Sequence, residues 1–303
     1  MSLGFLLASI EQGMLFAITA LGVYLTFRIL NYADLSVDGS FPLGAAVSAR
    51  LIVAGVNPIF AVPAAAAAGA LAGSITGFLN TRLKITGLLS GILTMTSLYS
   101  INLRIMGRSN IPLLQQPTIF SMAGGAFGSS GAASFLLLGI ILLGVMFLLY
   151  SFLRTQLGFA LRAAGDNPQM VRSLGVNTDN MKLLGLVLSN AIVGLSGALA
   201  GQFMGFADVG MGIGTVVAGL ASVIIGEVLV GDRGIGFAIV SVALGSIVYR
   251  LCISIALSYG FAASDLKLMT AVLVVIALSA PRFKEWFWNL QSVNGWCSTD
   301  ARD

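Results

Sequence analysis

Carboxylates that lie beside glycine and proline are the side chains best placed for chemistry inside the apolar parts of this chain. Asp34 and Asp38 occur in "NYADLSVDGSFPLG", directly before Gly39 and Pro42, where we expect a helix to break. A carboxylate at a helix N-terminus accepts hydrogen bonds from unpaired backbone N–H groups. We therefore predict capping of a half-helix beside a pore, with direct contact to a solute as the alternative. The candidate helix-break and pore residues are Asp34, Ser36, Asp38, Gly39, Pro42 and Asp208.

Other polar side chains within apolar segments are interpreted structurally. Arg50 and Arg250 are expected to extend toward the outer membrane interface, with pore lining as the alternative. Asn102 and Asn190 are expected to form hydrogen bonds between helices rather than to line a polar path.

The residue pattern does not support catalysis, metal binding or nucleic-acid binding. The chain has no histidine and only two cysteines, Cys252 and Cys297. No nucleophile and base occur at a recognisable spacing, and no Gly-x-x-x-x-Gly-Lys-Ser/Thr phosphate loop is present. The net charge of +4 is spread over many loops, which is not typical of a nucleic-acid-binding protein. We predict that the chain is not an enzyme and binds no metal or cofactor of its own.

The elements that must position these residues are membrane helices. The 303 residues are 57% hydrophobic and 9% charged, with a mean hydropathy of +0.96, so the apolar surface exceeds what a soluble fold buries. Apolar runs of about 20 residues recur, which is the length that crosses a bilayer. We predict an all-α, polytopic helical membrane protein with about nine or ten transmembrane helices. The nine spans are expected near residues 3–26, 39–56, 58–80, 86–106, 134–153, 182–204, 213–230, 235–257 and 266–280.

Basic residues predict the orientation of the chain. Most of them fall on one side of the predicted spans, which the positive-inside rule assigns to the cytoplasm, with the N-terminus outside and the C-terminus inside. Arg104 and Arg108 oppose this pattern, and a re-entrant piece near 34–54 or 111–133 would change the local topology. The predicted organisation is a single transmembrane domain at 1–281, with a cytoplasmic coupling segment at 155–181, a main external loop at 108–133, and a cytoplasmic interfacial tail at 282–303.

The chain also contains a weak internal repeat. The segment "NYADLSVDGSFPLGAAVSARLIVAG" from Asn31 resembles "GFADVGMGIGTVVAGLASVIIG" from Gly205. The predicted topology places Asp34 and Asp208 on opposite sides of the membrane, which is the mark of an inverted repeat in transporters. Chance similarity between spans rich in glycine and alanine is the alternative.

Two stripes of glycine predict close helix packing. Glycines spaced four residues apart lie on one face of a helix and let another backbone approach closely. The stripes consist of Gly69, Gly73 and Gly77, and of Gly197, Gly201 and Gly205.

The polar stretch "RAAGDNPQMVRSLGVNTDNMKL" from Arg162 interrupts the apolar spans. Asn167 is a suitable N-cap, Pro168 fits the first helical position and Gly175 fits a helix stop, so a helix of about two turns is predicted. Its apolar face is expected to carry Met170, Val171 and Leu174 beside Arg172. Such a face predicts a partner with a groove, whereas an amphipathic loop on the membrane surface is the alternative.

At these residues the chain resembles the membrane subunits of ATP-binding-cassette importers in the branched-chain amino acid and ribose permease group. Members carry a cytoplasmic pattern R-A-x-G-x-N-P-x-x-x-x-x-x-G-[IV]-N, present here as Arg162, Ala163, Gly165, Asn167, Pro168, Gly175, Val176 and Asn177. The likeness extends over most of the chain, and "YADLSVDGSFPLGAAVSA" is similar to a branch labelled for aromatic amino acids.

The resemblance implies that the polar stretch is a coupling helix that docks on a separate cytoplasmic ATPase subunit, which binds the ATP and Mg²⁺. It further implies an extracytoplasmic solute-binding protein that delivers an amino acid or other small polar solute, and a second permease subunit, expected to be an identical copy, in the lipid bilayer of the bacterial inner membrane. A self-sufficient secondary transporter driven by an ion gradient is the alternative. The residues expected to couple to the ATPase are Arg162, Ala163, Gly165, Asp166, Asn167, Pro168, Met170, Val171, Arg172, Leu174 and Gly175.

Overall fold

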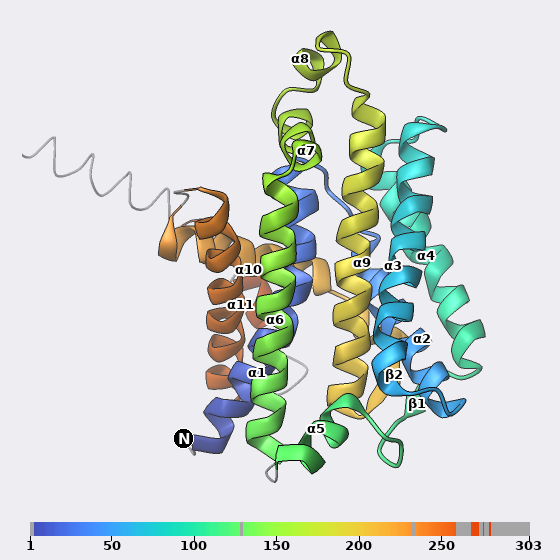
Figure 1. Cartoon of the computed structure of the whole chain (residues 1–303), viewed down its shortest axis with the longest axis vertical. Coiled ribbons are helices and arrows are strands. Elements are labelled where there is room, and N and C mark those ends of the chain that lie inside the picture. The colour runs from blue at the N-terminus through green and yellow to red at the C-terminus, as the bar shows by residue number, and fades with distance from the viewer. Residues whose placement is uncertain are drawn as a thin grey trace, which may run out of the picture.

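The computed structural model describes residues 3–127, 130–231, 234–258, 268–272, 275 and 279. In this part of the chain, long helices form a bundle, and short helices and one pair of strands lie at its two ends (Figure 1). We call the end with α7 and α8, uppermost in Figure 1, the coupling end, and the end with β1 and β2 the strand end.

The long helices follow the first eight predicted spans closely. They are α1 (Leu3–Tyr24), α2 (Val37–Val53), α3 (Pro58–Thr81), α4 (Gly87–Met106), α6 (Ser130–Arg154), α9 (Thr178–Met204), α10 (Thr215–Val230) and α11 (Ile235–Ser258). The shorter elements are the π-helix η1 (Leu25–Ile29), β1 (Asn110–Pro112), α5 (Ile119–Phe127), α7 (Gln156–Asp166), α8 (Pro168–Ser173), β2 (Phe206–Asp208) and the 3-10 helix η2 (Val209–Gly212).

The all-α, polytopic membrane class is confirmed. Within the described residues, six helical segments are long and apolar enough to cross a membrane: Gly4–Ile29, Pro58–Thr81, Gly131–Arg154, Thr178–Met204, Val209–Val230 and Ile235–Ser258. Of the other predicted spans, α2 has 17 residues and α4 carries serine, threonine and asparagine along its length. The ninth predicted span, 266–280, lies mostly outside the described residues and the tail, 282–303, lies wholly outside them. The total of nine or ten spans stays a prediction.

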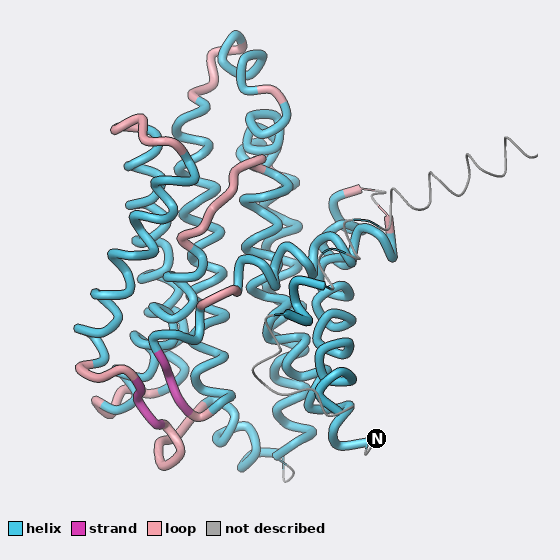
Figure 2. The backbone as a smooth tube through the Cα atoms, turned by 180° about the vertical axis from the view of Figure 1, so that it is seen from behind, coloured by secondary structure: helices cyan, strands magenta, loops and turns pink. Residues whose placement is uncertain are grey.

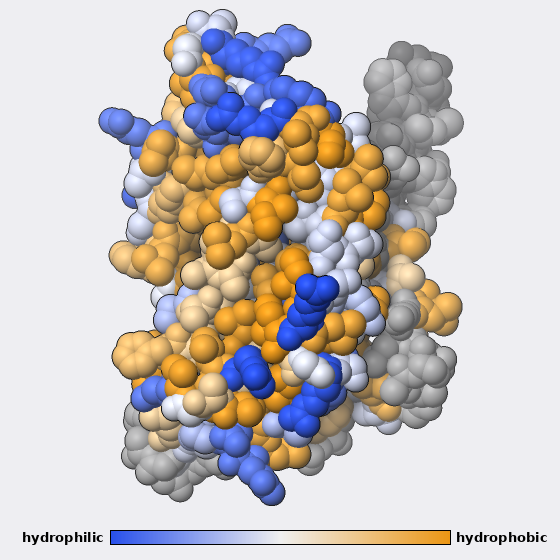
Figure 3. Space-filling model, turned by 90° about the vertical axis from the view of Figure 1, so that its right-hand side faces the viewer, coloured by the Kyte–Doolittle hydropathy of each residue, from blue (hydrophilic) through white to orange (hydrophobic). Residues whose placement is uncertain are grey.

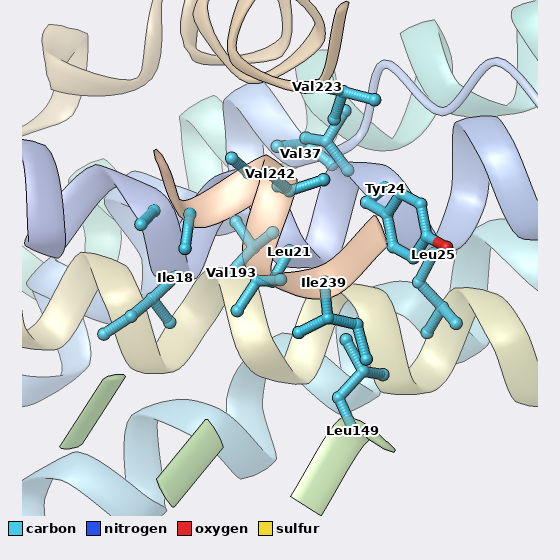
Figure 4. Packing of buried hydrophobic residues seen from close by; sticks show 14 of the residues in the cluster. Ile18, Leu21, Tyr24, Leu25, Val37, Leu149, Val193, Val223, Ile239 and Val242 are labelled. Atoms are coloured by element: carbon cyan, nitrogen blue, oxygen red, sulfur yellow. The ribbon is translucent and has the colours of Figure 1, made fainter. Parts of the chain in front are cut away.

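The core of the bundle is apolar, and so is much of its outer surface. Leu15, Ile18 and Leu21 of α1 are fully buried among side chains of the neighbouring long helices, as Figure 4 shows for Leu21, Val193 of α9 and Val242 of α11. Large apolar side chains also cover the outside, and Figure 3 shows them between a hydrophilic coupling end and scattered hydrophilic groups in the lower half. An apolar exterior of this extent fits a hydrocarbon solvent rather than water.

The two segments of the predicted repeat run in opposite directions. After η1, residues 30–36 descend from the coupling end into the bundle, where Asp34 meets Asn190 in the middle of α9, and α2 continues to the strand end (Figure 1). The second segment begins at β2, passes through η2 and continues as α10 to Val230, and Glu227 in the last turn of α10 pairs with Arg28 of η1. This antiparallel course is the one that an inverted repeat requires.

Glycines bring α2 and α3 into backbone contact with α9. A methyl group on Gly69 or Gly73 would overlap the carbonyl oxygen of Asn190 or Leu186, and one on Gly197 would overlap that of Phe41. Gly77 and Gly201 make looser contacts, in which an added methyl would lie 3.2 Å from Leu183 and 3.3 Å from Ala45. Five of the six stripe glycines therefore lie at contacts between helices.

Gly205 is the exception in the second stripe, and its predicted packing role is wrong. It has a φ of +76° and ends α9 as a left-handed C-cap. Its missing side chain allows this conformation, which other residues adopt at a cost.

The segment 108–133, predicted as the main external loop, contains regular structure. Strand β1 pairs with β2 in antiparallel register, with Asn110 opposite Asp208, and Figure 2 shows the two strands at the strand end. Helix α5 follows, and α6 begins within the predicted loop at Ser130. The side of the membrane on which this segment lies stays a prediction.

Candidate functional site

The predicted coupling helix is confirmed as a structural element. The Asn167 side-chain oxygen accepts a hydrogen bond from the Met170 N–H at 3.0 Å, Pro168 is the first residue of α8, and Gly175 has a φ of +83° beyond its end. Figure 1 shows α8 beyond the ends of the long helices. The sequence therefore fixes a short, capped helix at the coupling end.

The predicted apolar face of this helix is wrong in one residue. Val171 is 3% exposed and packs into its own chain, whereas Met170 is 56% and Leu174 69% exposed. Helical spacing alone does not separate these residues, because Val171 and Leu174 are three apart and also lie near one another on a helix surface. Val171 is buried on the side where α8 contacts α7 and α9. The surface that α8 offers to a partner is thus Met170, Leu174 and the exposed Arg172.

Helix α7 precedes α8 and was not predicted. Thr155 caps it by accepting a hydrogen bond from the Gly158 N–H at 3.2 Å. Threonine followed by the spaced apolar residues Leu157, Leu161 and Ala164 was the available signal, and the polar residues of 162–167 obscured it. Arg162, Ala163, Gly165 and Asp166 therefore belong to α7, not to a loop.

Helix α7 lies directly on the end of η1. Gly165 contacts the backbone of Ile29 so closely that a methyl group would overlap the Ile29 carbonyl oxygen. Leu161 is fully buried beside Leu30 and Gly185 of α9. The coupling segment therefore packs closely on η1 and α9, with backbone atoms in contact at Gly165. Close packing of this kind transmits displacement from one element to the next.

Charged groups join α8 to its neighbours. The Arg172 Nε donates to Thr178 Oγ1 at 2.7 Å, and Asp179 lies 3.6 Å from the Arg172 guanidinium and 2.8 Å from Lys84 Nζ. Arg172 and Lys84 are exposed and Asp179 is partly exposed, so each of the two ion pairs stabilises the fold by about 1 kcal/mol or less. Their role is to hold α8, the start of α9 and the α3–α4 connection in one arrangement.

Arg162 is half-buried on α7. Its guanidinium lies 5.5 Å from the centroid of the Phe159 ring, and its buried Nε has no hydrogen-bond partner among the described residues. Asp166 is exposed at the end of α7, and Ala163 is half-buried.

Asp38 caps a helix, but not the helix that the sequence predicted. Its carboxylate accepts hydrogen bonds from Gly214 N–H at 3.0 Å, Val216 N–H at 2.8 Å and Thr215 Oγ1 at 2.8 Å, all at the start of α10. Its own helix, α2, begins at Val37 and continues through Gly39 and Pro42 without a break. The predicted break at Gly39–Pro42 is wrong, because the helix is interrupted before Val37 and Pro42 lies inside α2.

Asp34 belongs to a buried polar network. It accepts hydrogen bonds from the N–H and hydroxyl of Ser36, and from Asn190 Nδ2 at 2.8 Å, while Ser40 donates to Asn190 Oδ1 at 2.6 Å. All four residues are buried. The expected helix-to-helix role of Asn190 is confirmed, and Asp34 is satisfied within the chain.

Asp208 lies apart from this network. It caps η2 by accepting from the Gly210 N–H at 2.7 Å and also accepts from Asn110 Nδ2 at 3.3 Å across the strand pair. The structure therefore gathers Asp34, Ser36, Asp38, Gly39 and Pro42 at the start of α2 and leaves Asp208 at the strand end.

Arg250 is the residue whose position the sequence missed. It was expected to extend to the membrane interface, but its guanidinium lies 3.6 Å from the centroid of the Phe16 ring, and its Nε is buried. An arginine inside α11 was the signal, and only the tertiary contact with α1 shows its direction.

The described part of the chain contains no cluster of three or more histidine, cysteine, aspartate or glutamate side chains that could hold a metal ion. The geometry defines a membrane helical bundle with a short, capped helix at one end and two oppositely directed segments that meet inside it.

Comparison with known proteins gives the family. A model described as "Branched-chain amino acid transport system / permease component" matches residues 5–278. The "Tyrosine transport system permease protein" of Clostridioides difficile is 42% identical over 275 residues, covering 90% of each chain. An uncharacterised protein of Rickettsia prowazekii is 34% identical, covering 91% of this chain and 97% of that one. The ribose import permease protein of Escherichia coli is 26% identical over 63% of this chain and 59% of its own. No solved structure matches the chain significantly.

The chain is thus a multi-pass transport permease, and it belongs to the family of branched-chain amino acid transport system permease components. It is the permease component of an ABC-type transport system for small solutes, located in the bacterial inner membrane. Its homologues are transport permeases, not enzymes.

Proposed function

We propose that this chain forms the solute path of an importer and that α7 and α8 couple the path to a separate ATPase, which binds ATP and Mg²⁺. The observation that carries the proposal is α8, a capped helix beyond the ends of the long helices with Met170 and Leu174 exposed. Two large apolar side chains beside the exposed Arg172 suit the groove of a partner protein.

The contacts of α7 and α8 lead toward the middle of the bundle by two routes. Gly165 lies on Ile29 of η1, and η1 continues into residues 30–36 and α2. Arg28 of the same π-helix forms an ion pair of 2.8 Å with Glu227 at the end of α10. A displacement of the coupling segment would therefore reach both α2 and α10, which are joined by the hydrogen bonds of Asp38.

In this mechanism, closure of the ATPase subunits on ATP moves α8, and the two inverted segments change their relative position to open the path. Hydrolysis restores the first state. A partner shifts such an equilibrium only by contacting the two states differently, so α8 and the strand end must each bind their partners with different affinity in each state.

The proposed substrate is an amino acid delivered by an extracytoplasmic binding protein, and the proposed complete importer contains a second permease subunit, an identical copy. The relative named for tyrosine transport, at 42% identity, supports L-tyrosine as the first solute to test. The family match favours this importer over the gradient-driven transporter.

The proposal is tested by uptake of L-tyrosine into proteoliposomes that contain this chain, its ATPase and its binding protein. We expect uptake only with ATP enclosed on the ATPase side. Leu174→Asp places a charge in the proposed apolar contact and should lower ATP-driven uptake about tenfold or more.

The matched control is Leu83→Asp, because Leu83 is also exposed at the coupling end but lies between α3 and α4, outside the segment. It should leave uptake within about twofold of the parent. ATP-independent uptake by the parent, or equal uptake by the two variants, would contradict the proposal.

A further inference from the structure

Arg250 occupies an unusual position for a charged side chain. It lies within α11, which is long and apolar enough to span a membrane, and its guanidinium stacks over the Phe16 ring of α1 at 3.6 Å. Its Nε is buried without a hydrogen-bond partner, and no carboxylate pairs with it among the residues that the structure describes. A charged guanidinium within an apolar span raises the free energy of the protein unless an anion pairs with it. We therefore expect an anion to pair with Arg250 during part of the transport cycle.

A cavity adjoins this arginine. It has a volume of about 480 Å³, and its walls come from α1, α10, α11, the segment before α10, and residues 270–271. Arg250 and Tyr249 provide polar groups, while Phe16, Met211 and Val217 are among the apolar wall residues. The volume lies within the range of small-molecule sites, and apolar walls with a few convergent polar groups are typical of them.

The start of α10 contributes to the same cavity. Gly214 and Thr215 line it at the helix N-terminus, where the macrodipole favours negative charge. Asp38 already caps this helix end by accepting hydrogen bonds from Gly214, Thr215 and Val216, so Arg250 is the cationic group that the cavity offers to an anion. The cavity therefore joins the half-buried Arg250, whose Nε is buried, to the N-terminal end of α10.

One of the other large hollows has a different character. It lies between α6 and α11 with a volume of about 670 Å³, and Leu143, Met146, Phe147 and Ile239 are among its mostly apolar lining residues. Arg154, at its edge, already lies 4.8 Å from the Tyr150 ring centroid at the end of α6. That hollow offers no buried unpaired cation among the described residues.

We propose that the cavity beside Arg250 binds the transported solute. Arg250 is the cation that pairs with the solute's carboxylate, and Phe16 forms the wall against which the apolar part of the solute packs. The proposal rests on the proposed function in that the solute crosses this chain. A guanidinium presents a planar fork of N–H donors that matches a carboxylate, and stacking on Phe16 fixes the plane of the fork.

The first experiment measures site occupancy in the purified permease. Val217 is exposed and lines the cavity, so Val217→Cys, in a variant whose Cys252 and Cys297 are serine, reports access of a thiol reagent. L-Tyrosine and L-leucine should slow labelling at least threefold, while tyramine and D-ribose, which lack a carboxylate, should not. Arg250→Met should abolish the protection.

The second experiment measures ATP-driven uptake in the complete importer. Arg250→Met should lower uptake of the carboxylate solute about tenfold or more, as expected for loss of a charge-assisted pair, and Arg250→Lys should lower it less. Arg50→Met is the matched control, because it removes an exposed arginine of α2 that does not line the cavity. ATPase activity should persist in all three variants.

The outcomes separate this inference from the proposed function. Protection without ATP-driven uptake would support the cavity and contradict the importer. Uptake that is unchanged in Arg250→Met, or protection that is absent, independent of the carboxylate, or retained in Arg250→Met, would overturn the cavity site. If Arg250→Met lowers the stability but leaves the protection unchanged, Arg250 has a structural role only, and the proposed carboxylate site is overturned as well.

Discussion

Replacing Gly197 by alanine should lower the free energy of unfolding by about 2–3 kcal/mol, although the change adds a single methyl group. The methyl would overlap the carbonyl oxygen of Phe41, where α2 crosses α9. Backbone atoms cannot rotate away as a flexible side chain can, so the helices must separate along a contact that also carries Asn190 and Ser40. ATP-driven uptake should fall with the stability of this crossing.

The matched control is Gly201→Ala, one turn along the same stripe. Its methyl would lie 3.3 Å from the Ala45 side chain, so we expect a change of about 0.5 kcal/mol or less. Equilibrium unfolding of the two purified variants in detergent measures the difference. Equal stability of the two variants would show that α2 and α9 do not cross at Gly197 as described.

Replacing Asp38 by alanine should destabilise the protein by about 2–4 kcal/mol and abolish most uptake. The change removes the acceptor for two backbone N–H groups and one hydroxyl at the start of α10. Each unpaired buried group costs about 1–3 kcal/mol, and a membrane interior offers few replacement partners. The junction of the two half-helices would loosen as a result.

Asp38→Asn should be milder, since one side-chain oxygen can still accept hydrogen bonds from α10. Asp208→Ala provides a second comparison, because Asp208 accepts from a single backbone N–H at the start of η2. We expect unfolding and uptake measurements to rank the variants as Asp38→Ala, then Asp38→Asn, then Asp208→Ala in decreasing severity. A ranking with Asp208→Ala as the most severe would place the key junction at the strand end instead.

Local chemistry explains which features could be predicted from the sequence. Asn167, Pro168 and Gly175 define α8 through their own backbone preferences, and the glycine stripes define faces through helical spacing alone. Apolar runs define the long helices because each must cover a hydrocarbon thickness. These features depend on residues close together in the sequence.

Apart from α7, the features that the sequence missed depend on contacts between distant segments. Asp38 was correctly expected to cap a helix, but its partner α10 is far along the chain, so the sequence near Asp38 could not name it. Val171 and Arg250 face inward because of α7, α9 and α1, not because of their immediate neighbours. Periodicity gives the spacing of a face but not the surface that it meets.

Backbone contacts at glycine connect the proposed docking helix to the interior. Gly165 seats the coupling segment on η1, and Gly197 and Gly73 hold α2 and α3 on α9. Between these contacts lie the Asp34–Asn190 network and the Asp38 cap, both of which join segments far apart in the sequence. We therefore expect movement of α7 and α8 to be transmitted to α2 and α10 rather than absorbed locally.

Docking of α8 on a separate ATPase can be measured by affinity co-purification of this chain from its native membrane, scored for an ATPase subunit. We expect recovery of the ATPase with the parent and with Leu83→Asp, and its loss with Leu174→Asp while the permease itself remains folded. Recovery of a folded parent chain without any ATPase, or equal recovery with Leu174→Asp, would show that α8 does not dock as proposed.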